Sequence, residues 1–266
     1  MPIEANTIAI TGASSGIGAA LAARLAAPGR RLALIGRDTG RLEDVAAICR
    51  TKGASCRIAS IDVCDAGRLA AFLQEFDHEQ PIDLLISNAG ILDGRHEDQH
   101  VEDRPTAERV LETNLLAAIN TIQSVLPKMR HRNRGDIVLV ASLAALVPLP
   151  DAPAYSASKA ALLSYGLALR EAVAKDGLRV VVACPGFVAT AMAPLHLGPR
   201  PSEISADDAA ARILAGLQRN RAVIGFPFVP YWLSRLSLLV PESVRRQGQR
   251  GTRFHVRSPA RTSAGT

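Results

Sequence analysis

The sequence lacks several features that would place it outside the cytoplasm. Its 266 residues include only four cysteines, none in a C-x-x-C pair, so we interpret them as ordinary core or surface thiols in a reducing compartment. The first residues have no basic region followed by an apolar one, so no signal peptide is expected. No internal repeat or low-complexity linker divides the chain. We therefore expect a single-domain cytoplasmic protein.

Acidic residues are absent from the end of the chain. After Glu242 there are six arginines and no acid, and without those six the chain carries 25 basic and 25 acidic residues. The basicity therefore belongs to a tail, and no nucleic-acid-binding face is indicated. Residues 248–266 are predicted to be a flexible basic tail, and residues 1–247 a nucleotide-binding domain.

Apolar runs alternate with helical patterns along most of the chain. This alternation predicts an α/β fold, a doubly wound parallel sheet with helices on both faces. In such sheets the ligand site lies at the carboxyl ends of the strands. The predicted strands are 7–10, 31–35, 56–61, 82–86, 137–141 and 179–183.

A glycine-rich turn follows the first predicted strand and precedes a predicted helix at 19–27. Strand, turn and helix in this order are typical of a dinucleotide site, where glycines let the backbone approach a pyrophosphate and the helix N-terminus attracts it. The predicted cofactor contacts in this turn are Gly12, Ser14, Ser15, Gly16, Ile17 and Gly18.

The second predicted strand ends in Gly36-Arg37-Asp38. An acidic residue at this tip would bind the ribose hydroxyls of NAD, whereas a basic one accommodates the extra phosphate of NADP. Arg37 therefore favours NADP over NAD. As an alternative, Asp38 pairs with Arg37 as a surface ion pair.

A tyrosine and a lysine stand four residues apart, at Tyr155 and Lys159. On a helix these positions share one face, and a fixed cation favours the phenolate, bringing the tyrosine pKa nearer to neutrality. Ser142, at the end of a predicted strand, can hold the oxygen of a carbonyl or alcohol. It does not stand in a G-x-S-x-G elbow, which argues against an esterase.

Taken together, these motifs resemble the short-chain dehydrogenase/reductase family over about residues 5 to 195. Other segments match the family pattern in the same order. They are Asp62 near the adenine, Asn88-Ala89-Gly90 beside the cofactor, Asn114 at a proton-relay water, Pro185, Gly186 and Val188 around the nicotinamide, and Thr190 at its carboxamide.

The resemblance implies hydride transfer between a nicotinamide cofactor and a ketone or secondary alcohol. By the same resemblance Tyr155 gives or takes the proton, Lys159 lowers its pKa and binds the nicotinamide ribose, Ser142 orients the substrate oxygen, and Asn114 supports the relay water. A homodimer or homotetramer is implied, formed through the helices that carry Asn114 and Tyr155. The alternatives are the same chemistry on a sugar or carbohydrate precursor, or a non-catalytic nucleotide-sensing or scaffold protein on this fold.

Residues 96–100 satisfy the zinc-protease pattern H-E-x-x-H, but their flanks are almost wholly polar. A zinc site needs both histidines on one face of a buried helix. We therefore interpret the segment as a loop or a short solvated helix and predict no metal.

The region after the nicotinamide segment is expected to select the substrate. Residues 187–225 are predicted to form the substrate lid, with a helix at 206–218. An apolar or lipid-like substrate is preferred because several apolar side chains stand at the start of this region. They are Phe187, Met192, Leu195 and Leu197, together with His196.

An aromatic, apolar segment follows at 226–240. It contains four of the ten aromatic residues and is shorter than the ~20 residues that span a bilayer. Two interpretations remain open for residues 226–246. One is a subunit interface or pocket wall, and the other is a peripheral membrane contact in which the aromatics meet the headgroups.

Overall fold

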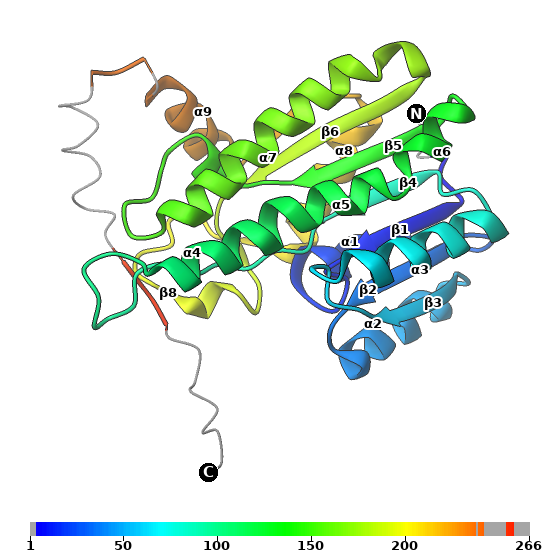
Figure 1. Ribbon diagram of the computed structural model, residues 1–266, viewed down its shortest axis with the longest axis horizontal. Helices are drawn as coiled ribbons and strands as arrows, with labels where there is room; N and C mark the ends of the chain where they lie inside the picture. Colours follow the sequence, from blue (N-terminus) through cyan, green and yellow to red (C-terminus); the bar gives the residue numbers. More distant parts are fainter. Residues whose placement is uncertain (1–3, 238, 242–253, 258–266) are drawn as a thin grey trace.

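A seven-stranded parallel sheet forms the centre of the molecule (Figure 1), with strand order β10-β6-β5-β4-β1-β2-β3. The computed structural model describes residues 4–237, 239–241 and 254–257. Every neighbouring pair of strands in this sheet runs parallel. The strands are β1 (Thr7–Thr11), β2 (Arg31–Gly36), β3 (Ser55–Ser60), β4 (Leu84–Ser87), β5 (Gly135–Val140), β6 (Leu178–Pro185) and β10 (Val223–Phe226).

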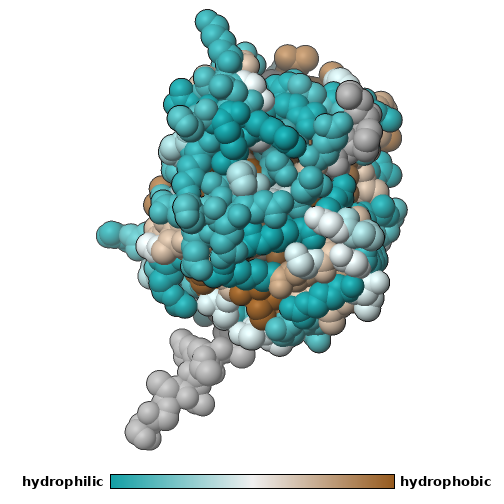
Figure 2. Space-filling model, turned by 90° about the vertical axis from the view of Figure 1, so that its right-hand side faces the viewer, coloured by the Kyte–Doolittle hydropathy of each residue, from teal (hydrophilic) through white to brown (hydrophobic). Residues whose placement is uncertain are grey.

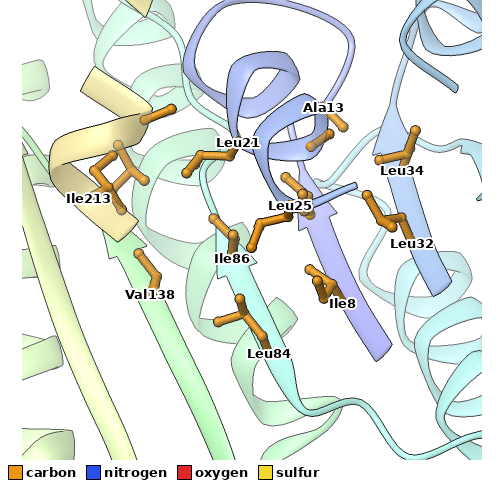
Figure 3. Packing of buried hydrophobic residues seen from close by; sticks show 14 of the residues in the cluster. Ile8, Ala13, Leu21, Leu25, Leu32, Leu34, Leu84, Ile86, Val138 and Ile213 are labelled. Atoms are coloured by element: carbon orange, nitrogen blue, oxygen red, sulfur yellow. The ribbon is translucent and has the colours of Figure 1, made fainter. Parts of the chain in front are cut away.

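Helices cover both faces of the sheet, as predicted. Along β1 the side chains of Ile8 and Ile10 join one core cluster and that of Ala9 joins the other, because successive strand residues point to opposite faces. The first face packs against α1 (Gly16–Leu25), α2 (Thr39–Thr51) and α8 (Ala206–Gln218), and Figure 3 shows part of this cluster. The second face packs against α3 (Ala66–Glu79), α5 (Ala117–Gln123), α6 (Leu126–His131) and α7 (Pro153–Ala172).

The six predicted strands are all present, but a seventh, β10, was not predicted. It has only four residues and lies at the sheet edge, where it pairs with β6 alone. The predicted helix 206–218 is α8, with the same bounds. However, α8 packs against one face of the sheet, burying Ala209 and Ile213, and contributes no residue to the cavity described below. Within the segment 187–225, for which a lid is predicted, the residues that line the cavity lie between Phe187 and Pro201.

Part of the predicted flexible tail is packed against the body. Residues His255–Val256 form strand β11, which runs antiparallel to β8 (His196–Leu197), and Phe254 and Val256 are buried. The red strand in Figure 1 lies beside β8. The prediction of a flexible tail over 248–266 was thus wrong for residues 254–257. The arginine-rich composition of the segment outweighed its two apolar side chains, Phe254 and Val256, which are buried. The rest of that segment lies outside the described residues.

The helix α9 (Phe228–Ser237) exposes apolar side chains on its outer face, including Phe228, Val229 and Leu233. By contrast, the face shown in Figure 2, on the right-hand side of Figure 1, is mainly hydrophilic. A subunit contact and a membrane contact both require an exposed apolar face, so both interpretations of 226–246 stand; residues 242–246 lie outside the described part. No helix in the described part of the chain is long and apolar enough to cross a bilayer.

Candidate active site

A cavity of about 730 Å³ opens at the carboxyl ends of the sheet strands. Its walls come from the turns that follow β1, β2, β4, β5 and β6, from the start of α7, and from α9. Strand order reverses between β1 and β4, and the crevice at such a reversal is where open α/β sheets bind ligands. Its volume falls within the range usual for small-molecule and cofactor sites.

The glycine turn forms one end of this cavity. Gly12 has a φ of +67°, a conformation that favours glycine. A Cβ atom at Gly18 would lie 2.2 Å from the carbonyl oxygen of Gly12, so the helix can approach the strand only without a side chain there. Helix α1 begins at Gly16, three residues earlier than predicted, which brings its free N–H groups to the cavity. This cradle fits the pyrophosphate of a dinucleotide.

Thr11 connects the glycine turn to β4. Its Oγ1 accepts hydrogen bonds from the backbone N–H groups of Asn88, at 3.1 Å, and Ala89, at 3.2 Å. In return, Asn88 Nδ2 donates to the carbonyl oxygens of Thr11 and Gly12. The threonine is almost fully buried. Sequence reasoning missed this role, although a hydroxyl residue at the end of a buried strand is the signal for it.

Asn114 lies fully buried in a π-helical turn, Glu112–Leu116, between α4 (Arg104–Leu111) and α5. Its amide donates to the carbonyl oxygen of Ile91 at 2.9 Å and to Ser158 Oγ at 3.2 Å, while its Oδ1 accepts from the N–H of Ile91. These bonds fix the loop that follows Gly90, and π-turns of this kind occur often at functional sites.

Ser142 and Tyr155 both line the cavity. Ser142 stands two residues after the end of β5 and accepts a hydrogen bond from the N–H of Ala144 at 3.1 Å. Burial raises the pKa of Tyr155 above its ordinary value, although its hydrogen bond with Ser142 acts in the opposite direction. The predicted lowering of the Tyr155 pKa by Lys159 is therefore not found, because the loss of hydration dominates.

Lys159 is buried one helical turn beyond Tyr155 on α7. Its Nζ donates to the carbonyl oxygen of Val140 at 3.1 Å and lies 5.8 Å from the centre of the Tyr155 ring. Burial lowers the pKa of Lys159 to about 8. The ammonium and the phenol thus face the same space, as the i, i+4 spacing predicted.

Arg37 projects into solvent beside the cavity, with Nη1 3.9 Å from a carboxylate oxygen of Asp62. The alternative pairing of Asp38 with Arg37 is wrong. Asp38 caps α2, accepting from the N–H of Arg41 at 3.0 Å and from its Nε at 2.7 Å, and the backbone bond holds its pKa below the ordinary value. Arg41 also lines the cavity and was missed, although it stands one helical turn after Arg37.

The segment after β6 forms a further wall of the cavity. The N–H of Gly186 donates to the carbonyl oxygen of Phe226 at 2.7 Å, and Thr190 Oγ1 accepts from the N–H of Met192 at 3.3 Å. A Cβ atom at Gly16 would lie 2.9 Å from the Thr190 methyl group, so this segment touches the turn after β1. Pro185, Gly186, Val188 and Thr190 all line the cavity, as do Asp62, Asn88, Ala89 and Gly90.

The remaining cavity wall is mostly apolar. Phe187, Met192 and His196 contribute to it as predicted, whereas Leu195 packs against Phe254 and neither Leu195 nor Leu197 lines the cavity. Sequence reasoning missed the contributions of Leu143, Val147, Pro148 and Leu149, which follow β5. Pro227 and Pro230 also line the cavity, and they lie in the segment 226–246, for which a pocket wall was one of the interpretations.

The H-E-x-x-H segment is a loop. His96 Nε2 lies 2.9 Å from Asp93, which also contacts Arg109. Among the described residues, no three histidine, cysteine or acidic side chains are grouped as metal ligands.

Comparison with known proteins decides the family. Residues 6–196 match the family model described as short chain dehydrogenase. The chain belongs to the short-chain dehydrogenase/reductase family. It is therefore an NAD(P)-dependent oxidoreductase that acts on alcohol or ketone groups.

Two relatives of this dehydrogenase extend over most of its length. An uncharacterized oxidoreductase of Myxococcus xanthus is 31% identical over 89% of this chain and 93% of its own. The 11-beta-hydroxysteroid dehydrogenase-like 2 of Arabidopsis thaliana is 30% identical over 91% of this chain and 80% of its own.

Among solved structures, a short-chain dehydrogenase from Sphingobium yanoikuyae in complex with NADPH is 26% identical, with a TM-score of 0.76. The alignment of the two structures covers 98% of this dehydrogenase and 100% of the Sphingobium chain. The bulky-bulky ketone specific alcohol dehydrogenase from Comamonas testosteroni, 24% identical over 97% of this chain and 98% of its own, has the same fold with a TM-score of 0.76.

Replacing Thr11 with valine should destabilise the protein, since two partly buried N–H groups lose their acceptor. We expect the free energy of unfolding to fall by about 2 kcal/mol or more, measured by urea denaturation. Thr11→Ser is the matched control, because it keeps the hydroxyl and should remain much closer to wild type. A Thr11→Val variant as stable as wild type, together with a destabilised Thr11→Ser variant, would show that the methyl group, not the hydroxyl, matters.

Burial of the Lys159 cation should make stability depend on pH. Since the folded-state pKa of about 8 lies below the ordinary 10.5, the unfolded chain binds more protons between these values, and wild type gains stability as pH rises through this window. The stability advantage of Lys159→Met over wild type should therefore shrink by roughly 2 kcal/mol between pH 7 and 9.5.

The same denaturation series with Lys175→Met, at an exposed lysine, provides the control. Its difference from wild type should stay constant across the range. A Lys159→Met difference that is equally constant would contradict the lowered pKa.

Proposed function

We propose that this protein is an NADPH-dependent reductase of ketones, or in the reverse direction a dehydrogenase of secondary alcohols, with an apolar substrate. The observation that carries the proposal is the arrangement of one cavity. Ser142, Tyr155 and Lys159 stand on its wall, the glycine turn lies at one end, and an apolar surface surrounds the remaining space. A homodimer or homotetramer remains part of the prediction.

The residues of the chain divide the chemistry between them. A bound nicotinamide would supply the hydride for reduction or receive it in oxidation. The Tyr155 hydroxyl gives its proton to the substrate oxygen as the carbonyl becomes an alcohol, and takes it back in the reverse direction. Ser142 donates a hydrogen bond to the same oxygen and holds it in front of Tyr155. Together these steps add one hydride and one proton across the C=O bond.

Lys159 supports the proton transfer through its charge and its position. Its ammonium, 5.8 Å from the Tyr155 ring, favours the phenolate that remains after the proton has left. The same group would hold the nicotinamide ribose. Asn114 fixes the carbonyl of Ile91 beside Gly90, and we assign it the support of a water that returns a proton to the site.

NADPH is preferred over NADH because of the charges at the far end of the cavity. Gly36 occupies the strand tip where an acid would bind the ribose hydroxyls, and Arg37 and Arg41 both line the cavity there. The Arg37 guanidinium lies 3.9 Å from an Asp62 carboxylate oxygen, and the Arg37 side chain is 73% exposed, which leaves it able to turn toward a phosphate. A Cβ at Gly36 would lie 3.3 Å from Ser14 Oγ, which places that hydroxyl at the same end.

An apolar substrate is preferred over a sugar because of the side chains beyond Tyr155. Val147, Leu149, Phe187, Met192 and Pro230 line that part of the cavity. A carbohydrate would leave several hydroxyl groups against these surfaces without partners, which costs free energy for each one. A scaffold protein without activity would not require Ser142, Tyr155 and Lys159 to lie in one cavity.

Cofactor binding tests the first half of the proposal. Titration with NADPH and NADH, followed by nicotinamide fluorescence, should give a much lower Kd for NADPH. Arg37→Ala and Arg41→Ala should each weaken NADPH about tenfold or more, as expected for loss of a charged hydrogen bond, and leave NADH nearly unchanged. Arg104→Ala, at an exposed site outside the cavity, is the control. Equal losses for both cofactors would refute the phosphate-binding role.

Turnover tests the second half. Tyr155→Phe removes only the hydroxyl, so it should bind NADPH nearly as well as wild type and lose activity by at least 10³-fold, in line with the loss of an acid–base group. The assay follows NADPH oxidation with cyclic and aryl ketones and, in parallel, with ketoses. A Tyr155→Phe variant with wild-type activity would overturn the proposed proton donor, and turnover of ketoses alone would overturn the apolar substrate.

A further inference from the structure

The C-terminal residues 254–257 return to the substrate side of the cavity. Beyond the pairing of β11 with β8, three backbone groups of this segment are bonded to the body. The N–H of Phe254 donates to Asp151 Oδ2, that of Val256 to the carbonyl oxygen of Arg95, and that of Arg257 to the carbonyl oxygen of Leu195, each at 2.9 Å. We call residues 254–257 the strap.

A buried ion pair between Arg95 and Asp151 bonds to the strap at Phe254. Arg95 Nε donates to Asp151 Oδ1 at 2.8 Å, and the side chain of Asp151 is fully buried. Arg95 Nη2 also donates to the carbonyl oxygen of Phe254 at 3.1 Å. Without the strap, a buried carboxylate oxygen and a guanidinium N–H would each lose a partner, and such losses are costly in a buried site. The ion pair therefore stabilises the seated strap.

The strap touches the cavity wall through His196. The ring of Phe254 lies 4.0 Å from that of His196, centre to centre, and His196 lies 4.9 Å from Phe187. Both His196 and Phe187 line the cavity, whereas Phe254 stands behind them. Burial lowers the pKa of His196, so the ring is neutral at pH 7 and packs as an aromatic wall.

The same cluster reaches the catalytic tyrosine. Leu149, Tyr155 and Leu195 pack against the buried group of Ala152, Phe254 and Val256. Asp151, which accepts from the strap, stands four residues before Tyr155 and just ahead of α7. The strap thus joins the start of the tyrosine helix to the segment carrying His196.

We propose that the strap completes the substrate half of the active site, and that Phe254 determines substrate size and position by backing His196. This inference rests on the proposed function. Seated, the strap keeps His196 and Phe187 at a fixed distance from Tyr155, so a compact apolar ketone is held against the tyrosine. Displaced, it leaves this wall free to move outward and admit bulkier ketones. The strap contacts given above involve no residue of the glycine turn.

The full-length double variant Phe254→Ala/Val256→Pro tests the proposal, because it removes the ring and the N–H that bonds to Arg95. Phe254→Leu preserves an apolar side chain, and Arg257→Ala alters only an exposed one while keeping its backbone bond. Each protein is assayed for NADPH binding, for KM and kcat with ketones of increasing bulk, and for amide hydrogen exchange at residues 195–197.

For the double variant we expect an NADPH Kd within threefold of wild type. Its KM for compact ketones should rise at least tenfold, with a smaller change in kcat. Its ratio of kcat/KM for bulky ketones to kcat/KM for compact ketones should be higher than that of wild type. Exchange at 195–197 should be at least tenfold faster. Phe254→Leu should be intermediate, and Arg257→Ala should match wild type.

Faster exchange with an unchanged size profile would overturn the role in specificity. Unchanged exchange would overturn the claim that these contacts seat the strap. A wild type that binds NADPH but turns over no ketone or alcohol would instead refute the proposed function, and exchange at 195–197 would still decide whether the strap is seated as described.

Discussion

The hydrogen bonds between Thr11 and Asn88 connect β1 to β4 where the strand order of the sheet reverses. Chains leave the two strands in opposite lateral directions at this point, which opens a crevice. An open crevice would expose backbone donors and acceptors, and the Thr11 hydroxyl and Asn88 amide satisfy those nearest the glycine turn. The cradle, the loop after Gly90 and the position of Lys159 beside that loop all depend on this connection.

Burial sets the electrostatic balance of the catalytic wall. The same loss of hydration raises the Tyr155 pKa and lowers that of Lys159, so each group is held toward its neutral form. A negatively charged cofactor entering the cavity would shift the lysine back toward its cation, since an opposite charge favours the charged form. Proton transfer by Tyr155 would thereby be coupled to occupancy of the cofactor half.

Local patterns predicted most of the residues at the end of the cavity beside the glycine turn, and the reason is physical. Gly12, Gly18, Arg37, Tyr155 and Lys159 each act within one strand, turn or helix, where spacing along the chain fixes spacing in space. The substrate half depends instead on meetings between distant segments. Composition identified 248–266 as basic and did not reveal that Phe254 packs on His196, because that contact depends on a buried ion pair between residues 56 positions apart. The sequence did not predict that Arg41 lines the cavity, because its position depends on the hydrogen bonds by which Asp38 caps α2.

The division between the two halves also explains how one scaffold serves different substrates. The cofactor end is built from the strand ends of the sheet itself, and altering its geometry would disturb the core on both faces. The substrate end is built from Val147–Leu149, the segment 187–201, α9 and the strap. In the described part of these segments, the strand contacts are the pairing of β7 (Val188–Ala189) with β9 (Ile204–Ser205) and that of β8 with β11. Side chains there can change without disturbing the central sheet. The seated strap supplies to this loosely supported wall the rigidity that the sheet supplies to the other end.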